Sequence, residues 1–301
     1  MRMTRLLLVA SVALMLGACA RGLHVERGSV FAEPEGATLR MNLYQPEGDA
    51  TGLRPGMVLI HGGGWVAGRR TQQAWYAREF ARAGYVVLAC DYRMMPHHAF
   101  PACVEDAKAA VRWLRLHADE YQIDPEHIVA FGASAGGHIA GMLAATRPDD
   151  GFEGDTNPGA SSAVEAAVIL YGAVDLTSYR DGAAGKAGIR FVGEFAGREF
   201  KKNPKRDQTD AYEWASPVTY VHPGMPPVHL SHGTRDALVA TEQSKHFYQR
   251  LQEAGVPSEL TLYENRNHGF DFMFPDERRE IFVDMLDFLD EHGIPRTPPR
   301  P

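Results

Sequence analysis

Cysteines, metal-ligand spacings, positive charge and long apolar runs are all scarce in this chain of 301 residues. Three cysteines cannot build a disulfide framework, and no C-x-x-C or H-E-x-x-H spacing indicates a metal site. The formal net charge of −7 gives no reason to expect a nucleic-acid partner. With 45% hydrophobic and 23% charged residues, the chain is expected to be globular and to have one substantial core.

The N-terminal apolar run is too short to cross a bilayer. It extends from Leu6 to Leu16, which is eleven residues, whereas a spanning helix needs about 20. Arg2 and Arg5 precede the run and small residues follow it. This is the pattern of a secretory signal, predicted here over residues 1–18.

The end of this signal also resembles the lipobox of bacterial lipoproteins. In Leu16-Gly17-Ala18-Cys19 the cysteine would be lipidated and become the new N-terminus, and Ala20 after it resembles the pattern sent to the outer membrane. We therefore expect an exported protein on the periplasmic side, held at the outer membrane by a lipid anchor at Cys19. A cleaved, soluble periplasmic protein is the alternative. Cys90 and Cys103 are expected as free buried thiols, although an oxidising compartment leaves their pairing open.

Short apolar strands alternate with helical patterns over the rest of the chain, which predicts one α/β domain over residues 19–301. A hairpin at a sheet edge is expected first, from residues 23–31 and 38–44. Further strands are expected at 57–60, 85–89, 128–131, 164–170, 227–230 and 259–263, and helices at 72–83, 101–117, 241–254 and 279–291. The resulting sheet should be twisted, mostly parallel and covered by helices on both faces.

Residues 174–219 break this alternation and are predicted to form a small cap insertion. The segment is rich in glycine and charge, with Phe191, Phe195 and Phe200 spaced along it. The aromatic residues could cover a pocket or form a small core of their own, and the sequence favours neither alternative.

The strongest motif surrounds Ser134. The apolar residues from Ile128 to Phe131 lead into Gly132-Ala133-Ser134-Ala135-Gly136, and an alanine-rich helical segment follows. A G-x-S-x-G sequence between a strand and a helix is typical of a nucleophile elbow, in which the tight turn holds the serine hydroxyl exposed above the sheet.

A serine nucleophile needs a base and an acid, and the sequence offers both at later strand ends. His268 follows the strand at 259–263, and Asp236 follows the strand at 227–230. Because ligands bind at the carboxyl ends of parallel strands, these residues are expected to meet Ser134. The histidine would take the serine proton, and the aspartate would orient the imidazole.

Other histidines and one other aspartate compete for these roles. His61 would brace the neighbouring glycine loop, His138 lies in the helix after the elbow, His232 precedes the acid turn and His246 is mid-helix. Asp175 also follows a strand, but it comes one strand too early for the order Ser, Asp, His. His268 and Asp236 are therefore the predicted pair.

An oxyanion hole is expected from the glycine loop and from the start of the elbow helix. The backbone N–H groups of Gly63, Gly64 and Ala135 are the predicted donors. Trp65 and Phe270 are predicted pocket walls, with core packing as the alternative for each.

Several motifs together resemble the α/β-hydrolase esterases, in the hormone-sensitive-lipase-like branch. Within it, the chain is most similar to bacterial feruloyl and acetyl-xylan esterase-like proteins, a group of carbohydrate esterases. The motifs that carry the resemblance are His61-Gly62-Gly63-Gly64-Trp65, Asp91-Tyr92-Arg93, Phe100-Pro101-Ala102, Gly132–His138, Ser216-Pro217-Val218 and the His-Gly-x-x-Asp turn at 232–236.

The resemblance implies hydrolysis of carboxylic esters without a cofactor. The expected substrates are short acyl or aromatic esters, such as acetyl or feruloyl groups on carbohydrates. Kynurenine formamidases share a similar glycine loop, so a formamidase-like amidase is one alternative. A non-catalytic binding lipoprotein on the same fold is the other.

Overall fold

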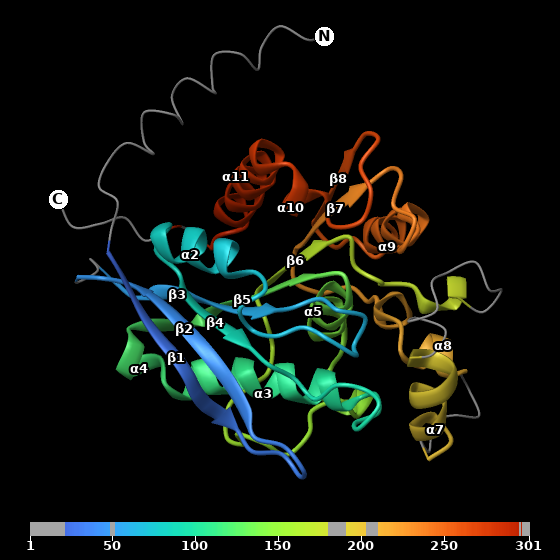
Figure 1. Cartoon of the computed structure of the whole chain (residues 1–301), viewed down its shortest axis with the longest axis horizontal. Helices are drawn as coiled ribbons and strands as arrows, with labels where there is room; N and C mark the ends of the chain where they lie inside the picture. The colour runs from blue at the N-terminus through green and yellow to red at the C-terminus, as the bar shows by residue number, and fades with distance from the viewer. Residues whose placement is uncertain (1–21, 49–51, 180–190, 203–209, 295, 297–301) are drawn as a thin grey trace, which may run out of the picture.

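The computed structural model describes residues 22–48, 52–179, 191–202, 210–294 and 296 (Figure 1). The predicted signal and Cys19 lie outside these residues. The described chain forms one eight-stranded sheet with the strand order β1-β2-β4-β3-β5-β6-β7-β8. Its strands are β1 (Leu23–Ala32), β2 (Leu39–Pro46), β3 (Arg54–Ile60), β4 (Val86–Cys90), β5 (Ile123–Ala133), β6 (Ala166–Leu170), β7 (Val228–Gly233) and β8 (Ser258–Tyr263).

The sheet is antiparallel at one edge and parallel elsewhere, as the sequence predicts. β1 and β2 form the expected hairpin, and β2 pairs antiparallel with β4. All pairs from β4 through β3, β5, β6 and β7 to β8 are parallel. The carboxyl ends of six strands therefore lie along one side of the sheet, where a site can form.

The alternation of side chains along the central strands creates two separate cores. On β3, Val58 and Ile60 pack into one core, whereas Met57 and Leu59 pack into the other. Apolar residues on both faces require helices on both faces. The main helices are α2 (Ala74–Arg82), α3 (Ala102–Leu116), α5 (Ala135–Ala145), α9 (Thr241–Glu253) and α11 (Pro275–Glu291).

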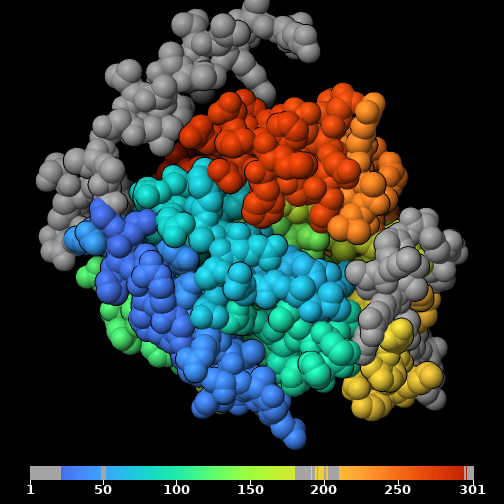
Figure 2. Space-filling view, viewed as in Figure 1, coloured from blue at the N-terminus to red at the C-terminus, as the bar shows by residue number. Residues whose placement is uncertain are grey.

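Each core is closed by its own set of helices. α3, α5 and α9 contribute to the first core, and α2 and α11 contribute to the second. Figure 2 shows the C-terminal segments, in orange and red, lying against α2, in cyan. Short elements complete the layers: α4 (Ala118–Tyr121), η1 (Pro148–Asp150) and α10 (Phe270–Met273).

The segment predicted as a cap consists, where described, of short helical pieces. These are η2 (Leu176–Tyr179), the π-helical η3 (Phe191–Ala196), α7 (Gly197–Phe200), α8 (Ala211–Trp214) and η5 (Pro217–Tyr220). Phe191 is buried, and its ring stacks on Trp65 with the ring centroids 4.2 Å apart. This segment therefore touches the residue that follows the glycine loop.

Cys90 and Cys103 are both buried and free. Burial raises the pKa of each thiol well above its usual value, so both stay protonated and inert.

Among the described helices, none combines the length and the apolar composition that crossing a membrane requires.

Candidate active site

Ser134 occupies the sharp turn between β5 and α5, in a backbone conformation that favours glycine. Its φ of 56° and ψ of −121° are unusual for a residue with a side chain. A Cβ on Gly132 would lie 2.1 Å from the carbonyl oxygen of Gly136, and a Cβ on Gly136 would lie 2.1 Å from that of Ile60. The two glycines thus permit the turn by letting the strand, the helix and β3 approach closely.

The structure brings Ser134, His268 and Asp236 together at the carboxyl ends of three strands. His268 Nε2 lies 2.8 Å from Ser134 Oγ, and His268 Nδ1 lies 2.7 Å from Asp236 Oδ2. A neutral imidazole that donates through Nδ1–H to the carboxylate accepts from the serine hydroxyl at Nε2. This is the arrangement in which a histidine can take the serine proton.

Both oxygens of the Asp236 carboxylate have hydrogen-bonding partners. Oδ1 accepts from the backbone N–H groups of Leu238 and Val239, at 2.9 and 2.8 Å. Oδ2 faces His268 and also lies 3.2 Å from Nε2 of the buried His232. Burial alone would raise the pKa of Asp236, but the hydrogen bonds from the two histidines outweigh it and hold the pKa well below its usual value. The carboxylate is therefore charged at neutral pH.

Asn267 joins the acid loop to the histidine loop. Its side-chain oxygen accepts from the backbone N–H of Ala237 at 3.0 Å and from that of His268 at 2.8 Å. A Cβ on Gly233 would lie 2.4 Å from the carbonyl oxygen of Arg266, so the two loops pack backbone to backbone. The relative position of Asp236 and His268 is fixed by these contacts.

The competing histidines each have hydrogen-bonding partners other than Ser134. His246 Nδ1 lies 2.8 Å from Asp175 Oδ2, so the alternative acid pairs with a different histidine. His138 contacts Trp65 and the carbonyl oxygen of Ala215, and His232 contacts Ser244 and Val239. His61 Nδ1 donates to the carbonyl oxygen of Gly62.

The glycine loop lies beside the nucleophile. A Cβ on Gly62 would lie 3.3 Å from Ser134 Cβ, and Gly63 and Gly64 have φ values of 125° and 60°. The His61 ring stacks on Tyr92 with centroids 4.3 Å apart, and the Tyr92 hydroxyl donates to the His61 carbonyl oxygen. His61 is thus held in place at the start of this loop. Ala135 is the first residue of α5, where backbone N–H groups have no partner within the helix.

Replacing Gly63 with alanine tests the loop. A Cβ at Gly63 would lie 2.0 Å from the carbonyl oxygen of Ala67, so the backbone must shift. Since loss of one oxyanion donor typically costs about 10²- to 10³-fold, we expect kcat to fall by this factor. Gly159→Ala is the matched control, because Gly159 also has a positive φ, of 96°, with open space around it. A folded Gly63→Ala variant with a normal kcat would contradict a role for this loop in turnover.

Trp65 and Phe270, the two predicted pocket walls, are both buried, and for Phe270 the prediction of a pocket wall is wrong. Phe270 has no exposed surface and packs against Tyr171 and Tyr263 in the core shared with α2 and α11. It is a packing residue, because a wall of a binding pocket must present some surface to the ligand. Trp65 is 3% exposed and lies between His138 and Phe191.

Tyr171 was not singled out by any sequence motif, yet it contacts the candidate base. Its ring meets the His268 ring edge-on, with centroids 4.7 Å apart, and its hydroxyl donates to the buried Asp271 at 2.6 Å. Tyr171 also has a φ of 36°, which is unusual for a bulky residue. Only the turn directly after β6 could have pointed to it.

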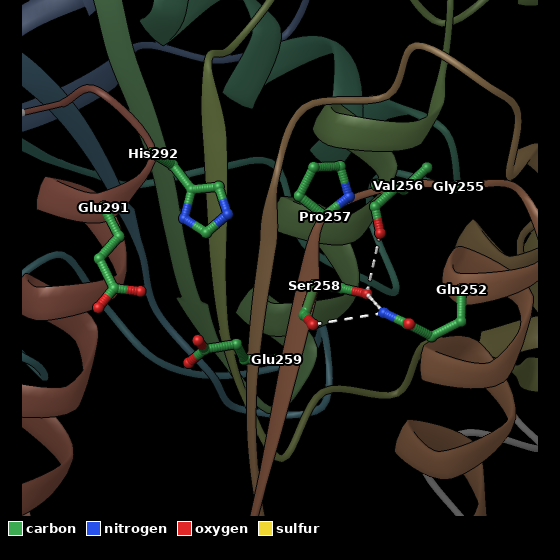
Figure 3. A pocket seen from close by; sticks show the side chains of 8 residues that line it. All are labelled: Gln252, Gly255, Val256, Pro257, Ser258, Glu259, Glu291 and His292. Carbon is green, nitrogen blue, oxygen red and sulfur yellow. Dashed lines mark hydrogen bonds between the residues drawn. The ribbon is translucent and has the colours of Figure 1, made fainter.

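A separate hollow, drawn in Figure 3, lies at the amino-terminal end of β8, whereas Ser134 follows the carboxyl end of β5. The Ser258 hydroxyl in this hollow accepts a hydrogen bond from the Gln252 amide. The His292 ring is hydrogen-bonded to the carbonyl oxygen of Phe288 in the preceding helix α11. These side chains do not form a nucleophile–base pair. Within the described part of the chain, no three histidine, cysteine or carboxylate side chains gather as metal ligands.

Comparison with known proteins places these features in a wider group. The BD-FAE family model matches residues 41–251. The probable carboxylic ester hydrolase LipM of Mycobacterium tuberculosis is 31% identical over 255 residues, which are 82% of this chain and 56% of LipM. Esterase LipC of the same organism is 30% identical over 85% of this chain and 63% of LipC. The chain thus spans less than two thirds of the length of these curated relatives.

Solved structures match over nearly their whole length. Esterase Est2 from the Planctomycetes species Thermogutta terrifontis, with propionate bound, has a TM-score of 0.74 and 29% identity. The match covers 93% of this chain and 97% of Est2. The same esterase phosphorylated by paraoxon gives a TM-score of 0.72 at 28% identity. The fold is therefore that of the α/β-hydrolases.

Proposed function

This chain belongs to the BD-FAE family of α/β-hydrolase esterases, and on that premise we propose that it hydrolyses carboxylic esters through Ser134, His268 and Asp236. The observation that supports this most strongly is the position of His268. Its two ring nitrogens lie within hydrogen-bonding distance of the Ser134 hydroxyl and the Asp236 carboxylate. A serine so placed can be deprotonated as it attacks a carbonyl carbon.

In the first half of the reaction, Ser134 Oγ attacks the ester carbonyl while its proton moves to His268 Nε2. The imidazolium that forms is stabilised by the charged Asp236, which keeps Nδ1–H in place. Negative charge develops on the carbonyl oxygen. The N–H groups of Gly63, Gly64 and Ala135 would donate hydrogen bonds to this oxygen and stabilise the charge. His268 then gives its proton to the leaving alcohol, and an acyl-enzyme remains.

In the second half, water replaces the alcohol. His268 takes a proton from water as it attacks the acyl carbonyl, and the same donors stabilise the second oxyanion. The proton returns to Ser134 Oγ, and the acid leaves. The two carbonyl additions use one set of residues, so no metal or organic cofactor enters any step.

The proposed substrates are esters of short acyl or aromatic acids, including acetyl or feruloyl groups on carbohydrates. The family match favours this class, and one solved relative, Est2, is described both with propionate and with butyrate bound. Short acids are therefore known ligands of a neighbour that the chain matches over 93% of its length.

An ester panel tests the substrate class. Purified protein is incubated with p-nitrophenyl acetate, butyrate and octanoate, with acetylated xylan and a feruloyl ester, and with N-formylkynurenine. We expect turnover that falls with acyl length and exceeds the hydrolysis of the formamide. Preferred hydrolysis of N-formylkynurenine would replace the esterase with an amidase. No turnover of any substrate by folded protein would favour a binding lipoprotein.

We further propose that the chain is an exported lipoprotein, with a signal over residues 1–18 and a lipid anchor at Cys19 on the periplasmic side of the outer membrane. Cys19→Ser removes the only thiol in the proposed lipobox, so the variant should leave the membrane fraction and appear as soluble protein. Membrane association that is unchanged in Cys19→Ser would contradict the anchor.

A further inference from the structure

His138 joins three segments of the chain through its side chain. It lies on α5, four residues after Ser134, and is completely buried. Nδ1 accepts a hydrogen bond from Trp65 Nε1 at 3.2 Å, and Nε2 donates to the carbonyl oxygen of Ala215 at 2.7 Å. Trp65 follows the glycine loop, and Ala215 follows α8. The elbow helix, the glycine loop and the segment after β6 therefore meet at one imidazole.

The partners of His138 fix both its tautomer and its charge. An indole N–H can only donate and a backbone carbonyl can only accept, so Nδ1 must be bare and Nε2 must carry the proton. A second proton on Nδ1 would place two N–H groups against each other. Burial lowers the pKa of His138 to about 4, so the neutral form persists at neutral pH. This histidine is unsuited to proton transfer, but it is well suited to hold a donor in place.

Trp65 is the group that requires holding. Its φ is 59°, in the left-handed region that bulky side chains rarely adopt, directly after Gly63 and Gly64. Such a conformation is strained and persists only where the surroundings enforce it. The indole is enclosed by His138 at its N–H and by the stacked ring of Phe191 on its face.

We propose that His138 is a positioning residue for the oxyanion loop, which it fixes to the nucleophile helix through the indole of Trp65. The inference rests on the proposed esterase function and adds a residue to it. His138 N–H donates to the carbonyl oxygen of Ser134 at 3.0 Å, so one residue is tied to the nucleophile by its backbone and to the glycine loop by its side chain. The distance between Ser134 Oγ and the loop N–H groups is thereby set by a short, rigid path.

His229 offers a matched control for burial alone. It is also completely buried, and burial likewise lowers its pKa to about 4. It lies on β7 against Phe288, and neither ring nitrogen has a hydrogen-bonding partner among the described residues. His229→Leu thus removes a buried imidazole without touching the glycine loop, and should leave kcat within about twofold of the parent protein.

Three substitutions at His138 separate its two hydrogen bonds. The amide oxygen of asparagine can take the place of Nδ1 and keep the bond from Trp65, whereas the amide nitrogen of glutamine can take the place of Nε2 and keep the bond to Ala215. Leucine keeps neither. Loss of one oxyanion donor typically costs about 10²- to 10³-fold, and a displaced donor is only partly lost. We therefore expect kcat for p-nitrophenyl butyrate to fall by about ten- to a hundredfold in His138→Gln and His138→Leu, where the loop is released from α5. His138→Asn should stay within about threefold, and KM should change little throughout.

Trp65→Phe removes the other end of the same bond. It should lower kcat about as much as His138→Leu, and the double variant should be no worse than either single one, because the shared interaction is lost only once. If His138→Leu fails to fold, His138→Gln and Trp65→Phe supply the same comparison.

Exchange of the Trp65 indole proton, followed by NMR, gives a readout that needs no turnover. The chain has four tryptophans, and the Trp65→Phe spectrum identifies the signal. The proton should exchange slowly in the parent protein and in His138→Asn, and at least tenfold faster in His138→Leu. Protection without ester hydrolysis would refute the proposed function and leave the hydrogen bond standing.

Two results would overturn the positioning role in an active protein. One is a kcat for His138→Leu equal to that of His229→Leu. The other is an equal loss in His138→Asn and His138→Leu, because the bond to Trp65 would then make no contribution.

Discussion

Replacing Ser134 with alanine should lower kcat for p-nitrophenyl butyrate by about 10⁴- to 10⁶-fold, while the melting temperature changes by only a few degrees. The hydroxyl is the atom that forms the acyl-enzyme, so no neighbouring group can replace it. Its contact in the folded protein is one hydrogen bond to His268, and this bond contributes little to stability. Activity and melting temperature, measured on the same preparation, test both statements.

Ser134→Gly provides a control with a different effect on stability. The backbone at this residue has a φ of 56°, which glycine adopts without strain. We expect the glycine variant to be as inactive as the alanine variant and to melt at a temperature no lower than the parent protein. Residual turnover above one per cent in either variant would exclude Ser134 as the nucleophile.

Replacing Asp236 with asparagine should lower kcat by about 10⁴-fold. An amide nitrogen can donate a hydrogen bond to His268 Nδ1, and this selects the tautomer in which Nε2 carries the proton. That tautomer cannot accept the proton of Ser134. The variant also loses the charge that stabilises the imidazolium, so kcat should fall much more than KM rises.

Asp175→Asn is the matched control for this substitution. Asp175 follows β6 and also accepts a hydrogen bond from a histidine, but this histidine is His246 of α9. We expect this variant to keep kcat within about fivefold of the parent value. The reverse result, with Asp175→Asn inactive and Asp236→Asn active, would make Asp175 the acid.

The layered fold could be predicted from local patterns because its strands and helices are strongly apolar and periodic. The two strands that begin several residues earlier than predicted do so through turn-forming residues. β3 begins at Arg54 and β5 at Ile123, and the two strands pair through Pro55 and Asp124. Proline and aspartate usually indicate turns. Only the parallel pairing of β3 with β5, which is not local in sequence, extends the strands through them.

The proximity of Ser134, Asp236 and His268 could be predicted because each follows a strand of one parallel sheet. Side-chain direction could not. Phe270 lies two residues from His268, yet the αL conformation of Gly269, with a φ of 69°, turns the chain so that Phe270 enters the core. A position close to His268 in the sequence therefore does not imply that a side chain faces the ligand.

The supporting residues were the least predictable part of the site. His138 contacts Trp65, which is distant in sequence, and His232 contacts Asp236 across a turn. The link from His138 to Trp65 joins residues 73 positions apart. Tyr171 reaches His268 from a different strand end. No periodicity in the sequence encodes such pairs, because they arise only when the sheet has aligned its loops.

The covalent intermediate on Ser134 can be tested most directly by mass spectrometry after incubation with paraoxon, which phosphorylates the solved Est2 relative. A serine activated by His268 should take up one diethylphosphoryl group, with release of one p-nitrophenolate. Peptide mapping should locate this group on Ser134 in the parent protein, and Ser134→Ala should take up none. Folded protein that stays unmodified, or carries the group on another residue, would contradict Ser134 as the proposed nucleophile.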